Sequence, residues 1–405
     1  MTGRNGTTAT MVSRRRVRLG ERLGRADKSP LGIWFWELDR VLLGLFVVLT
    51  AIGLIAVQAA SPATAARLST AQETLDPLHF FFQQLQWVLI GFPVLLIVSM
   101  MRRDQARRFA IISFCGVMGL MLLVPVMGKE VNGAVRWIGF GPLGIQPSEF
   151  LKPFYAVTLA WILSLKLKDP KLPVVALSIF VTLLIGLLLM LQPDLGQTII
   201  FCGIWLVLMA VAGLSLRMIF SLAAGGIGGV ILAYFFYPVA TQRIDAWLSG
   251  GEANDHLDLA YRTLTASGAI GVGPGLGTMK YKLPEAHTDY IFSVIGEEFG
   301  LLACAAIALL FLALLVRVIL RLLDEEDVFT ILAVTGLATQ FGGQAIINMA
   351  VNLQLFPSKG MTLPFISYGG SSFIALSIGA GLLLALTRRN PYLDRPRYIP
   401  KGRMQ

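Results

Sequence analysis

The chain has 405 residues, of which 55% are hydrophobic and only 14% are charged. An average soluble domain is about 25% charged, so this balance excludes an ordinary soluble protein and indicates a polytopic membrane protein. The net charge of +10 does not indicate nucleic-acid binding, because the basic residues lie in tails and short loops without an interleaved aromatic patch. We therefore expect no nucleic-acid partner.

Residues 1–38 are polar and rich in arginine, which predicts a disordered basic cytoplasmic arm. Ten apolar stretches of spanning length follow. They lie at roughly 41–60, 78–100, 109–127, 147–165, 172–191, 196–213, 218–239, 288–322, 327–354 and 362–387. We interpret the first as an uncleaved span, because it is longer than the apolar region of a signal peptide and more spans follow.

The distribution of basic residues sets the expected orientation. With the N-terminus inside, the basic gaps between spans face the cytoplasm, as the positive-inside rule requires. Those gaps carry Arg102, Arg103, Arg107, Arg108, Lys166, Lys168, Lys171, Arg217, Arg317 and Arg321. The sequence thus predicts an all-α polytopic fold of about ten transmembrane helices with both termini cytoplasmic. It comprises a membrane domain at 39–390, a large external loop at 240–287 between helices 7 and 8, and a cytoplasmic tail at 391–405.

Cysteine and histidine are too sparse and too dispersed for a disulfide framework or a metal centre. The cysteines, all inside apolar runs and expected to be buried, are Cys115, Cys202 and Cys304. The histidines are His79, His256 and His287. We assign no metal ligands.

A first polar segment comprises residues 129–137 and 146–152. Pro147 suits the first turn of a helix, where its missing N–H costs nothing, and the helix dipole favours Glu149 in that turn. Lys152 lies three residues on and faces the same way. The pair is either a structural ion pair inside the membrane or the charged lining of a cavity that receives an anionic headgroup.

Two other segments are rich in turn residues. At 192–197, Asp194 and Gly196 predict a tight external turn rather than a catalytic site. The Gly-rich run 271–277 is not a nucleotide-binding loop, because it neither follows a strand nor opens a helix, and no Gly-Lys-Ser/Thr follows. We interpret it as a flexible loop that approaches a substrate closely.

Residues 283–298 are the most informative stretch of the chain. They place three ionisable residues at the mouth of a long apolar segment: Glu285, His287 and Asp289. A carboxylate where a membrane helix meets water is costly to keep, which favours a functional role for Asp289. Thr288 is predicted to cap a helix that Asp289 begins. At about 100° per residue, Glu297 and Glu298 would then face away from Asp289 and serve packing or a partner face.

A fourth polar segment combines Asn348 and Asn352 with residues 357–372, which are rich in Pro, Gly and hydroxyl groups. Such irregular backbone is tolerated at membrane depth only where protein or a cavity covers it. Lys359 is either a phosphate contact or an interfacial lysine whose amine reaches the headgroups.

Together these segments resemble the SEDS family (shape, elongation, division and sporulation proteins), membrane glycosyltransferases that polymerise peptidoglycan from lipid II. The resemblance covers about residues 38–390. Its motifs are 133–137, 146–152, 193–197, 283–298 and 359–372. Residues 59–62, 277–284 and 384–391 resemble the cell-division members of alphaproteobacteria most, with the elongation paralogue as the alternative.

The resemblance implies a reaction in which the 4-hydroxyl of a lipid II GlcNAc attacks C1 of the MurNAc at the lipid-linked end of a glycan. Undecaprenyl diphosphate leaves and the anomeric centre inverts. The family's required Asp falls on Asp289, as the base or as a ligand for a divalent cation (Mg²⁺ or Mn²⁺) near the diphosphate.

The resemblance also assigns roles to other positions. Implied substrate contacts are Glu149, Lys152, Arg136, Lys359, Arg243 and His287. Implied structural or loop positions are Trp137, Pro147, Asp194, Gly273, Gly275, Gly277, Pro364, Gly369 and Gly370. Lys152 would complement the diphosphate.

The implied partners are lipid II, the polyprenyl-linked glycan, a single-span class B penicillin-binding transpeptidase and other division membrane proteins. The implied location is the inner membrane at the division septum, with the 240–287 loop as the lever through which the transpeptidase activates the enzyme. A lipid II transporter and a scaffold are the alternatives from other classes. A transporter needs charge compensation midway through the membrane, whereas Asp289 lies at the outer edge.

Overall fold

The computed structural model describes residues 30–70, 74–131, 134–140, 143–167, 169–236, 241, 244–245, 255–357 and 360–389. The chain divides into two units, one comprising residues 39–387 and the other comprising the two terminal segments. The short helix α1 (Pro30–Glu37) belongs to the terminal unit. All the features below belong to residues 39–387.

Each of the ten predicted apolar stretches contains a helix. These are α2 (Arg40–Leu68), α3 (His79–Ser99), α4 (Arg103–Met127), α5 (Pro147–Ser164), α6 (Val174–Leu191), α7 (Leu195–Val211), α8 (Leu216–Phe236), α11 (Ile291–Leu322), α12 (Val328–Asn352) and α13 (Ser371–Leu386). Among the described residues, seven helices are long and apolar enough to cross a membrane, and α7 and α13 are shorter apolar helices. The chain is therefore an all-α polytopic membrane protein, as predicted. Ten crossings and the cytoplasmic location of both termini stay predictions.

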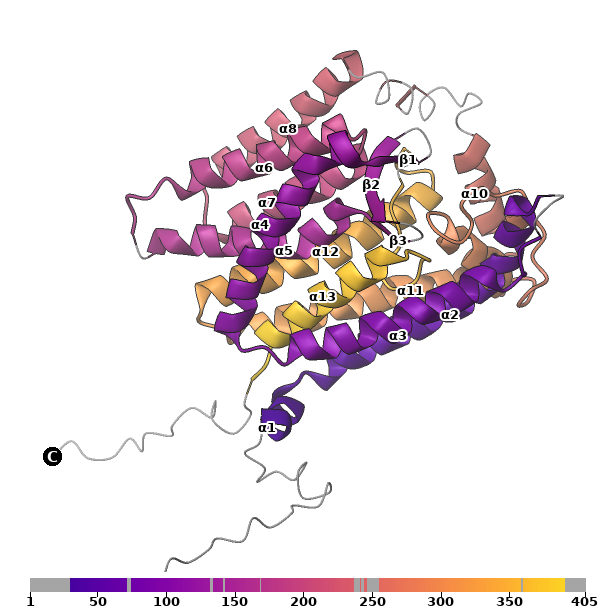
Figure 1. Cartoon of the computed structure of the whole chain (residues 1–405), viewed down its shortest axis with the longest axis horizontal. Helices are drawn as coiled ribbons and strands as arrows, with labels where there is room; N and C mark the ends of the chain where they lie inside the picture. The colour runs from indigo at the N-terminus through magenta and orange to yellow at the C-terminus, as the bar shows by residue number, and fades with distance from the viewer. Residues whose placement is uncertain are drawn as a thin grey trace, which may run out of the picture. The chain divides into compact units, whose positions relative to one another are not determined.

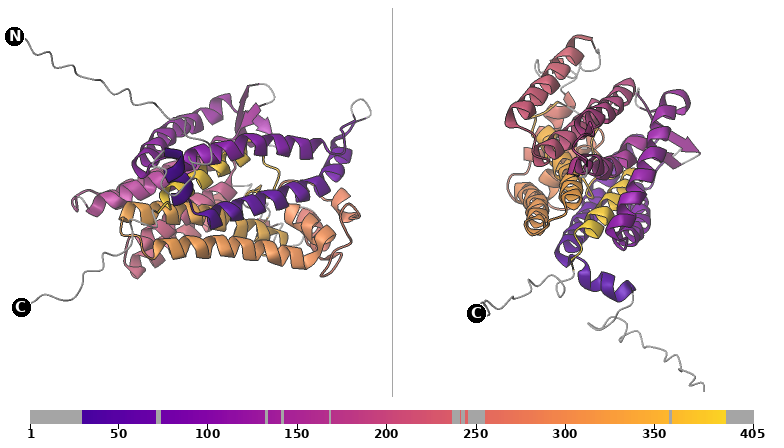
Figure 2. Two further views of the ribbon diagram at one scale, coloured as in Figure 1. Left: turned by 90° about the horizontal axis from the view of Figure 1, so that it is seen from below. Right: turned by 90° about the vertical axis from the view of Figure 1, so that its left-hand side faces the viewer.

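The helices run roughly along one direction, and α2 and α3 lie side by side (Figures 1 and 2). The protein buries 67% of the most apolar part of α5 and of α12, against 22% for α3 and 28% for α11. α5 packs on α4, α12 and α13, and α12 also contacts α7 and α11. Polar residues on α5 and α12 are thus enclosed by protein rather than by lipid, so they are tolerated at membrane depth.

The outer helices present apolar side chains on their surfaces, as a lipid-facing protein requires. Ile112 of α4 is 72% exposed and Leu183 of α6 is 67% exposed. All three cysteines are free, but only Cys304 is buried. The expectation of burial was wrong for Cys115 and Cys202, because an apolar run in a membrane helix supplies the lipid-facing surface as well as the core.

A small antiparallel sheet lies between α4 and α5 (Figure 1). Its strands, in spatial order, are β1 (Lys129–Val131), β2 (Ala134–Phe140) and β3 (Leu143–Ile145). The register pairs Lys129 with Trp137 and Ile138 with Ile145. This sheet was not predicted, because β1 and β3 have only three residues each, too few to show the alternation that identifies a strand.

The predicted external loop 240–287 contains structure of its own. Helix α10 (Asp255–Thr265) packs on α11 through its apolar face. The buried residues of that face are Leu257, Ala260 and Leu264. A short 3-10 helix, η3 (Met279–Tyr281), follows and packs against α2.

The Gly-rich run before η3 is anchored at a break in α11. Gly300 has φ 85° and ψ 171°, which interrupts the helix. The amide of Val272 donates to Glu297 O at 3.0 Å, and the amide of Leu301 donates to Gly268 O at 3.1 Å. The run therefore supplies partners for the helix ends at the break, and it is held in place where the sequence analysis expected a flexible loop.

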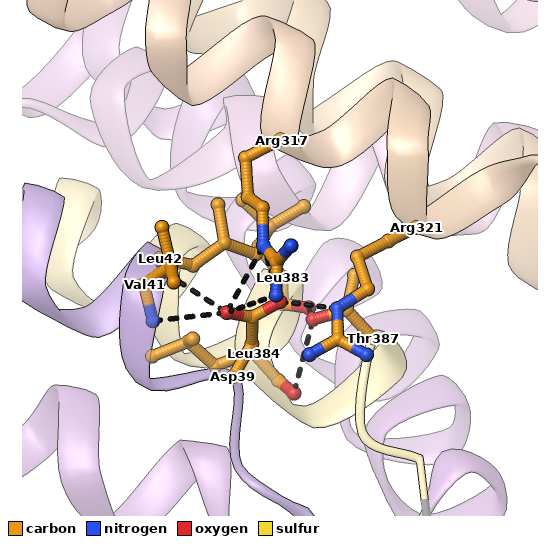
Figure 3. A network of polar contacts seen from close by, with 8 residues as sticks. All are labelled: Asp39, Val41, Leu42, Arg317, Arg321, Leu383, Leu384 and Thr387. Carbon is orange, nitrogen blue, oxygen red and sulfur yellow. Dashed lines mark hydrogen bonds and ion pairs between the residues drawn. The ribbon is translucent and has the colours of Figure 1, made fainter. Parts of the chain in front are cut away.

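At the opposite end of the bundle, Asp39 joins the start of α2 to the end of α11 (Figure 3). Its Oδ1 caps α2 by accepting the amides of Val41 and Leu42 at 3.0 and 3.2 Å. Its Oδ2 accepts from Arg317 Nε at 3.0 Å and from Arg321 Nε. Burial raises the pKa of Asp39, but the hydrogen bonds from Arg321 and Arg317 outweigh it and leave the pKa below its usual value.

Candidate active site

The turn that carries Asp289 is not helical. Residues 284–290 form turns, and α11 begins only at Ile291. The predicted cap was wrong, because the Thr288 hydroxyl donates to Glu285 Oε2 at 2.8 Å instead of capping α11. Other segments of the chain donate to the carbonyl groups of His287, Thr288 and Asp289, which therefore do not start the hydrogen-bond ladder of α11.

Donors on other segments hold this turn through three of its consecutive carbonyl oxygens. The amide of Tyr368 donates to His287 O at 2.9 Å. The Ser367 hydroxyl donates to Thr288 O at 2.6 Å. The side-chain amides of Asn348 and Asn352 donate to Asp289 O at 2.9 and 3.2 Å. The Asp289 backbone is thereby held between α12 and the 360–370 segment, which positions its carboxylate.

The Asp289 carboxylate and the Arg136 guanidinium both lie close to one glycine, Gly360. A Cβ atom placed on Gly360 would be 3.6 Å from Asp289 Oδ2 and 4.0 Å from Arg136 Nη1. Gly360 is exposed and Asp289 is half-buried. The structure thus brings an acid from the turn before α11 and a cation from β2 near one exposed glycine, and the predicted roles of Asp289 and Arg136 toward substrate stay predictions.

Arg136 is held by the turn between α6 and α7. Its Nε donates to Gln192 O at 2.9 Å, and its Nη2 donates to Pro193 O. Asp194 lies 3.8 Å from the Arg136 Nε and caps α7 by accepting the amide of Gln197 at 3.2 Å. The prediction of a tight turn at 192–197 is confirmed, and the turn also positions a cation.

Glu149 and Lys152 form the predicted pair one turn apart on α5, with 2.8 Å between Lys152 Nζ and Glu149 Oε2. Lys152 also donates to Gln344 Oε1 at 2.9 Å, and Glu149 accepts from Ser372 at 3.0 Å and from Gln197. Lys152 is fully buried. In this conformation the pair is a closed ion pair, and its role as a headgroup contact stays a prediction.

His287 is enclosed by aromatic rings. Its ring centroid lies 4.5 Å from that of Phe80 and 5.1 Å from that of Tyr368, and its Nδ1 is 3.2 Å from Thr64 Oγ1. Burial lowers the pKa of His287 to about 4, although the nearby Glu285 carboxylate raises it. The ring is therefore neutral at physiological pH, and its contact with substrate stays a prediction.

In the Gly-rich run, Gly275 and Gly277 lie beside Glu298 and Glu297 of α11. The amide of Gly275 donates to Glu298 Oε2 at 3.1 Å. The Glu297 carboxylate accepts the amides of Met279 and Lys280 at 2.7 and 3.0 Å, beside Gly277. Lys280 Nζ pairs with Glu298 and donates to Ala59 O. Glu297 and Glu298 were predicted to serve packing or a partner face, and the structure shows both carboxylates buried and bonded within the protein.

The other predicted structural positions lie on the small sheet and the 360–370 segment. Trp137 packs over Gly144, where an added Cβ would be 3.2 Å from its ring. Pro147 occupies the first position of α5, as predicted. Pro364, Gly369 and Gly370 belong to a largely buried irregular segment, so the last helix begins at Ser371 and not near residue 362. Lys359 and Arg243 lie outside the described residues.

Several residues of this site were not identified from the sequence. Gln344, Thr64 and Phe80 come from three separate helices and carry no local motif. A signal did exist for one set, because amides recur every four residues along α12. Among the described residues, no group of three His, Cys, Asp or Glu side chains could hold a metal ion.

The chain is similar to one protein family over most of its length. Residues 39–392 match the family of FtsW, RodA and SpoVE, described as cell cycle proteins. A protein of Caulobacter vibrioides described as a probable peptidoglycan glycosyltransferase FtsW is 36% identical over 368 residues, which is 91% of this chain and 93% of that protein. A protein of Nitrosomonas europaea with the same description is 35% identical over an alignment of 378 residues, with 87% of this chain and 94% of that protein covered.

Solved structures are similar as well. A chain from a peptidoglycan synthase complex, studied for how it coordinates polymerization and crosslinking, has a TM-score of 0.71 and 27% identity and covers 86% of this chain and 97% of that chain. The rod shape determining protein RodA of Thermus thermophilus has a TM-score of 0.64 and 27% identity, with 86% and 96% covered.

Proposed function

Because the chain belongs to the FtsW, RodA and SpoVE family, we propose that it is a peptidoglycan glycosyltransferase that polymerises lipid II for septal wall synthesis. The family relatives described as probable peptidoglycan glycosyltransferases support the activity. The observation that carries the proposal is the meeting of the Asp289 carboxylate and the Arg136 guanidinium at Gly360.

The reaction assigns a separate task to each charge. Asp289 accepts the proton of the attacking GlcNAc 4-hydroxyl as the bond from that oxygen to MurNAc C1 forms. The bond from C1 to the diphosphate oxygen breaks with inversion, and the leaving diphosphate carries away the electron pair. Arg136 offsets the charge that develops on the diphosphate. Lys152 would do the same once its pair with Glu149 opens toward the headgroup.

A divalent cation fits the same place. Asp289 would hold Mg²⁺ or Mn²⁺ together with the diphosphate oxygens, and the bound ion would neutralise the leaving group. Manganese titration followed by electron paramagnetic resonance, with undecaprenyl diphosphate present, tests this role. Equal binding by wild type and Asp289→Ala would leave Asp289 as the base alone.

We also assign this chain a partner and a location. The synthase complex among its structural relatives supports a class B penicillin-binding transpeptidase as the partner, with other division membrane proteins beside it. Helix α10 and the Gly-rich run form an external surface on α11, through which such a partner would act on the Asp289 turn. The location is the inner membrane at the septum. A RodA-type role in elongation is the second candidate, because RodA shares the fold.

The test is lipid II polymerisation by the purified protein with its cognate transpeptidase, with glycan strands resolved on a gel. We expect Asp289→Asn to lower the rate by about 10²- to 10⁴-fold, the usual contribution of a general base. Asp104→Asn is the matched control, since Asp104 is an exposed carboxylate that pairs with Arg107 on α4 at 2.9 Å. Wild type without product would favour a lipid II transporter, and an active Asp289→Asn variant would remove Asp289 from the chemistry.

A further inference from the structure

Helix α12 carries four buried amide side chains at intervals of four residues. They are Gln340, Gln344, Asn348 and Asn352, and none is more than 2% exposed. Four residues advance an α-helix by about 6 Å and by little more than a full turn, so these side chains share one face. We call them the amide ladder. Buried amides are costly unless they are hydrogen-bonded, so their partners reveal what the ladder does.

The two amides nearest the C-terminal end of α12 hold the Asp289 turn. Asn348 and Asn352 both donate to Asp289 O. The Ser293 hydroxyl donates to Asn352 Oδ1 at 2.6 Å, which leaves the Asn352 NH₂ group for Asp289. These bonds engage the main chain of Asp289 and not its carboxylate, so they set the position of the acid without consuming it.

The amide ladder also holds the main chain of Met361 and Thr362 and the buried amine of Lys152. Asn348 Nδ2 donates to Met361 O at 2.7 Å, and Gln344 Nε2 donates to Thr362 O at 2.9 Å. Gln344 Oε1 accepts from Lys152 Nζ. One rigid helix face therefore contacts the acid's turn, the segment beside Gly360 and the cation on α5. Gln340, one turn further down, has no partner for either amide atom among the described residues.

We infer that Asn348, assisted by Asn352 and Gln344, is a positioning residue that fixes Asp289 relative to Lys152 and the 361–368 segment. The inference rests on the proposed function for the roles of Asp289 and Lys152. The three amides are buried and bonded to protein, so they act through Asp289 and do not touch substrate. A shift of about 1 Å in a catalytic group costs on the order of 100-fold in rate, which is the scale of effect expected here.

The test compares Asn348→Leu with Gln340→Leu. Both replace a buried amide of the ladder by an apolar side chain of similar size, but only the first removes donors that are in use. We expect Asn348→Leu to lower the kcat of lipid II polymerisation by about 10- to 100-fold while KM stays within about twofold. Gln340→Leu should retain both constants. Asn348→Ser serves where Asn348→Leu does not fold, because its hydroxyl is too short to span both carbonyls.

A second measurement does not depend on activity. Hydrogen exchange of the wild type and variants is followed on peptides that cover residues 285–293 and 361–368. Faster exchange in both peptides for Asn348→Leu, and not for Gln340→Leu, supports the positioning role of Asn348, which we call the clamp. Unchanged exchange in the Asn348 variants overturns it, even if the wild type polymerises lipid II. A raised KM with unchanged kcat also overturns it, because that result would assign Asn348 to binding. Wild type without polymerisation refutes the proposed function alone, since the exchange result still decides the clamp.

Discussion

His287 lies within two residues of Asp289, yet its enclosure by Phe80 and Tyr368 gives it a different task. Burial keeps the ring neutral, with a pKa of about 4 in the folded protein against an ordinary value of about 6.5. The neutral ring can accept from or donate to the Thr64 hydroxyl, which ties the Asp289 turn to α2.

This shift predicts a pH dependence of stability. The unfolded chain takes up a proton on His287 at a higher pH than the folded protein does, so the stabilisation is complete above about pH 6.5 and declines as the pH falls toward 4. We expect the midpoint of thermal unfolding in detergent to fall more steeply over this window in wild type than in His287→Gln. Parallel curves for the two proteins would show that the ring is not held neutral.

At the scale of elements, the break in α11 depends on glycine for two separate reasons. Gly300 lies in the left-handed region, and a Cβ atom there would be 2.2 Å from Ala269 O. Gly275 has a similar φ of 80°, but no atom lies within 4 Å of its Cβ position. The two glycines therefore separate the cost of backbone strain from the cost of displacing the Gly-rich run.

We predict that Gly275→Ala costs about 1–2 kcal/mol, the cost of an L-residue in the left-handed region. Gly300→Ala should cost more than that, because residues 268–273 would have to move away from the helix ends that they cap. The measurement is the unfolding midpoint of each variant, together with proteolysis of the 266–282 segment. Equal losses for the two variants would contradict the packing described at the break.

For the whole molecule, ion pairs at the end opposite Asp289 fasten helices that are distant in the sequence. Asp39 joins α2 to α11 (Figure 3). Arg103 at the start of α4 meets Glu325 in the connection between α11 and α12 through two bonds of 3.1 and 2.8 Å. These bonds close one end of the bundle, while the hydrogen-bonded site lies at the other.

The Asp39 cluster predicts a second pH dependence. The pKa of Asp39 is depressed in the folded protein, so its stabilisation is present above the ordinary value and is lost as the pH falls through the depressed one. At pH 7, Asp39→Asn should cost on the order of 2 kcal/mol, the scale of a hydrogen bond to a charged group. The difference from wild type should shrink below about pH 4.

The matched control for Asp39 is Asp104→Asn. Asp104 pairs with Arg107 at 2.9 Å, but its side chain is 78% exposed, and exposed pairs contribute little. If both variants lost the same stability at pH 7, the Asp39 cluster would be an ordinary surface pair.

Local sequence patterns were enough to predict the ten apolar segments, the helix start at Pro147, the Glu149–Lys152 pairing and the place of Asp289 just before a long apolar helix. These features follow from local composition and from side-chain spacing along one element, which do not depend on how the elements pack. The same reasoning failed at Thr288, because a helix cap was inferred where distant segments hold the carbonyl groups of the turn. The irregular backbone expected at residues 357–372 is confirmed for 360–370, and only the start of the last apolar stretch was placed too early, because α13 begins at Ser371.

Which polar groups come together depends on the packing of distant segments. Arg136 and Asp289 are 153 residues apart in the sequence, and both lie near Gly360 from a third segment. The partners of Lys152 and His287, on α12 and α2, likewise depend on how helices pack side by side. The spacing of amides on α12 is visible in the sequence, but the carbonyl groups that they hold are not. A hydrogen bond between distant segments is fixed by the packing of the whole bundle, and no local pattern records it.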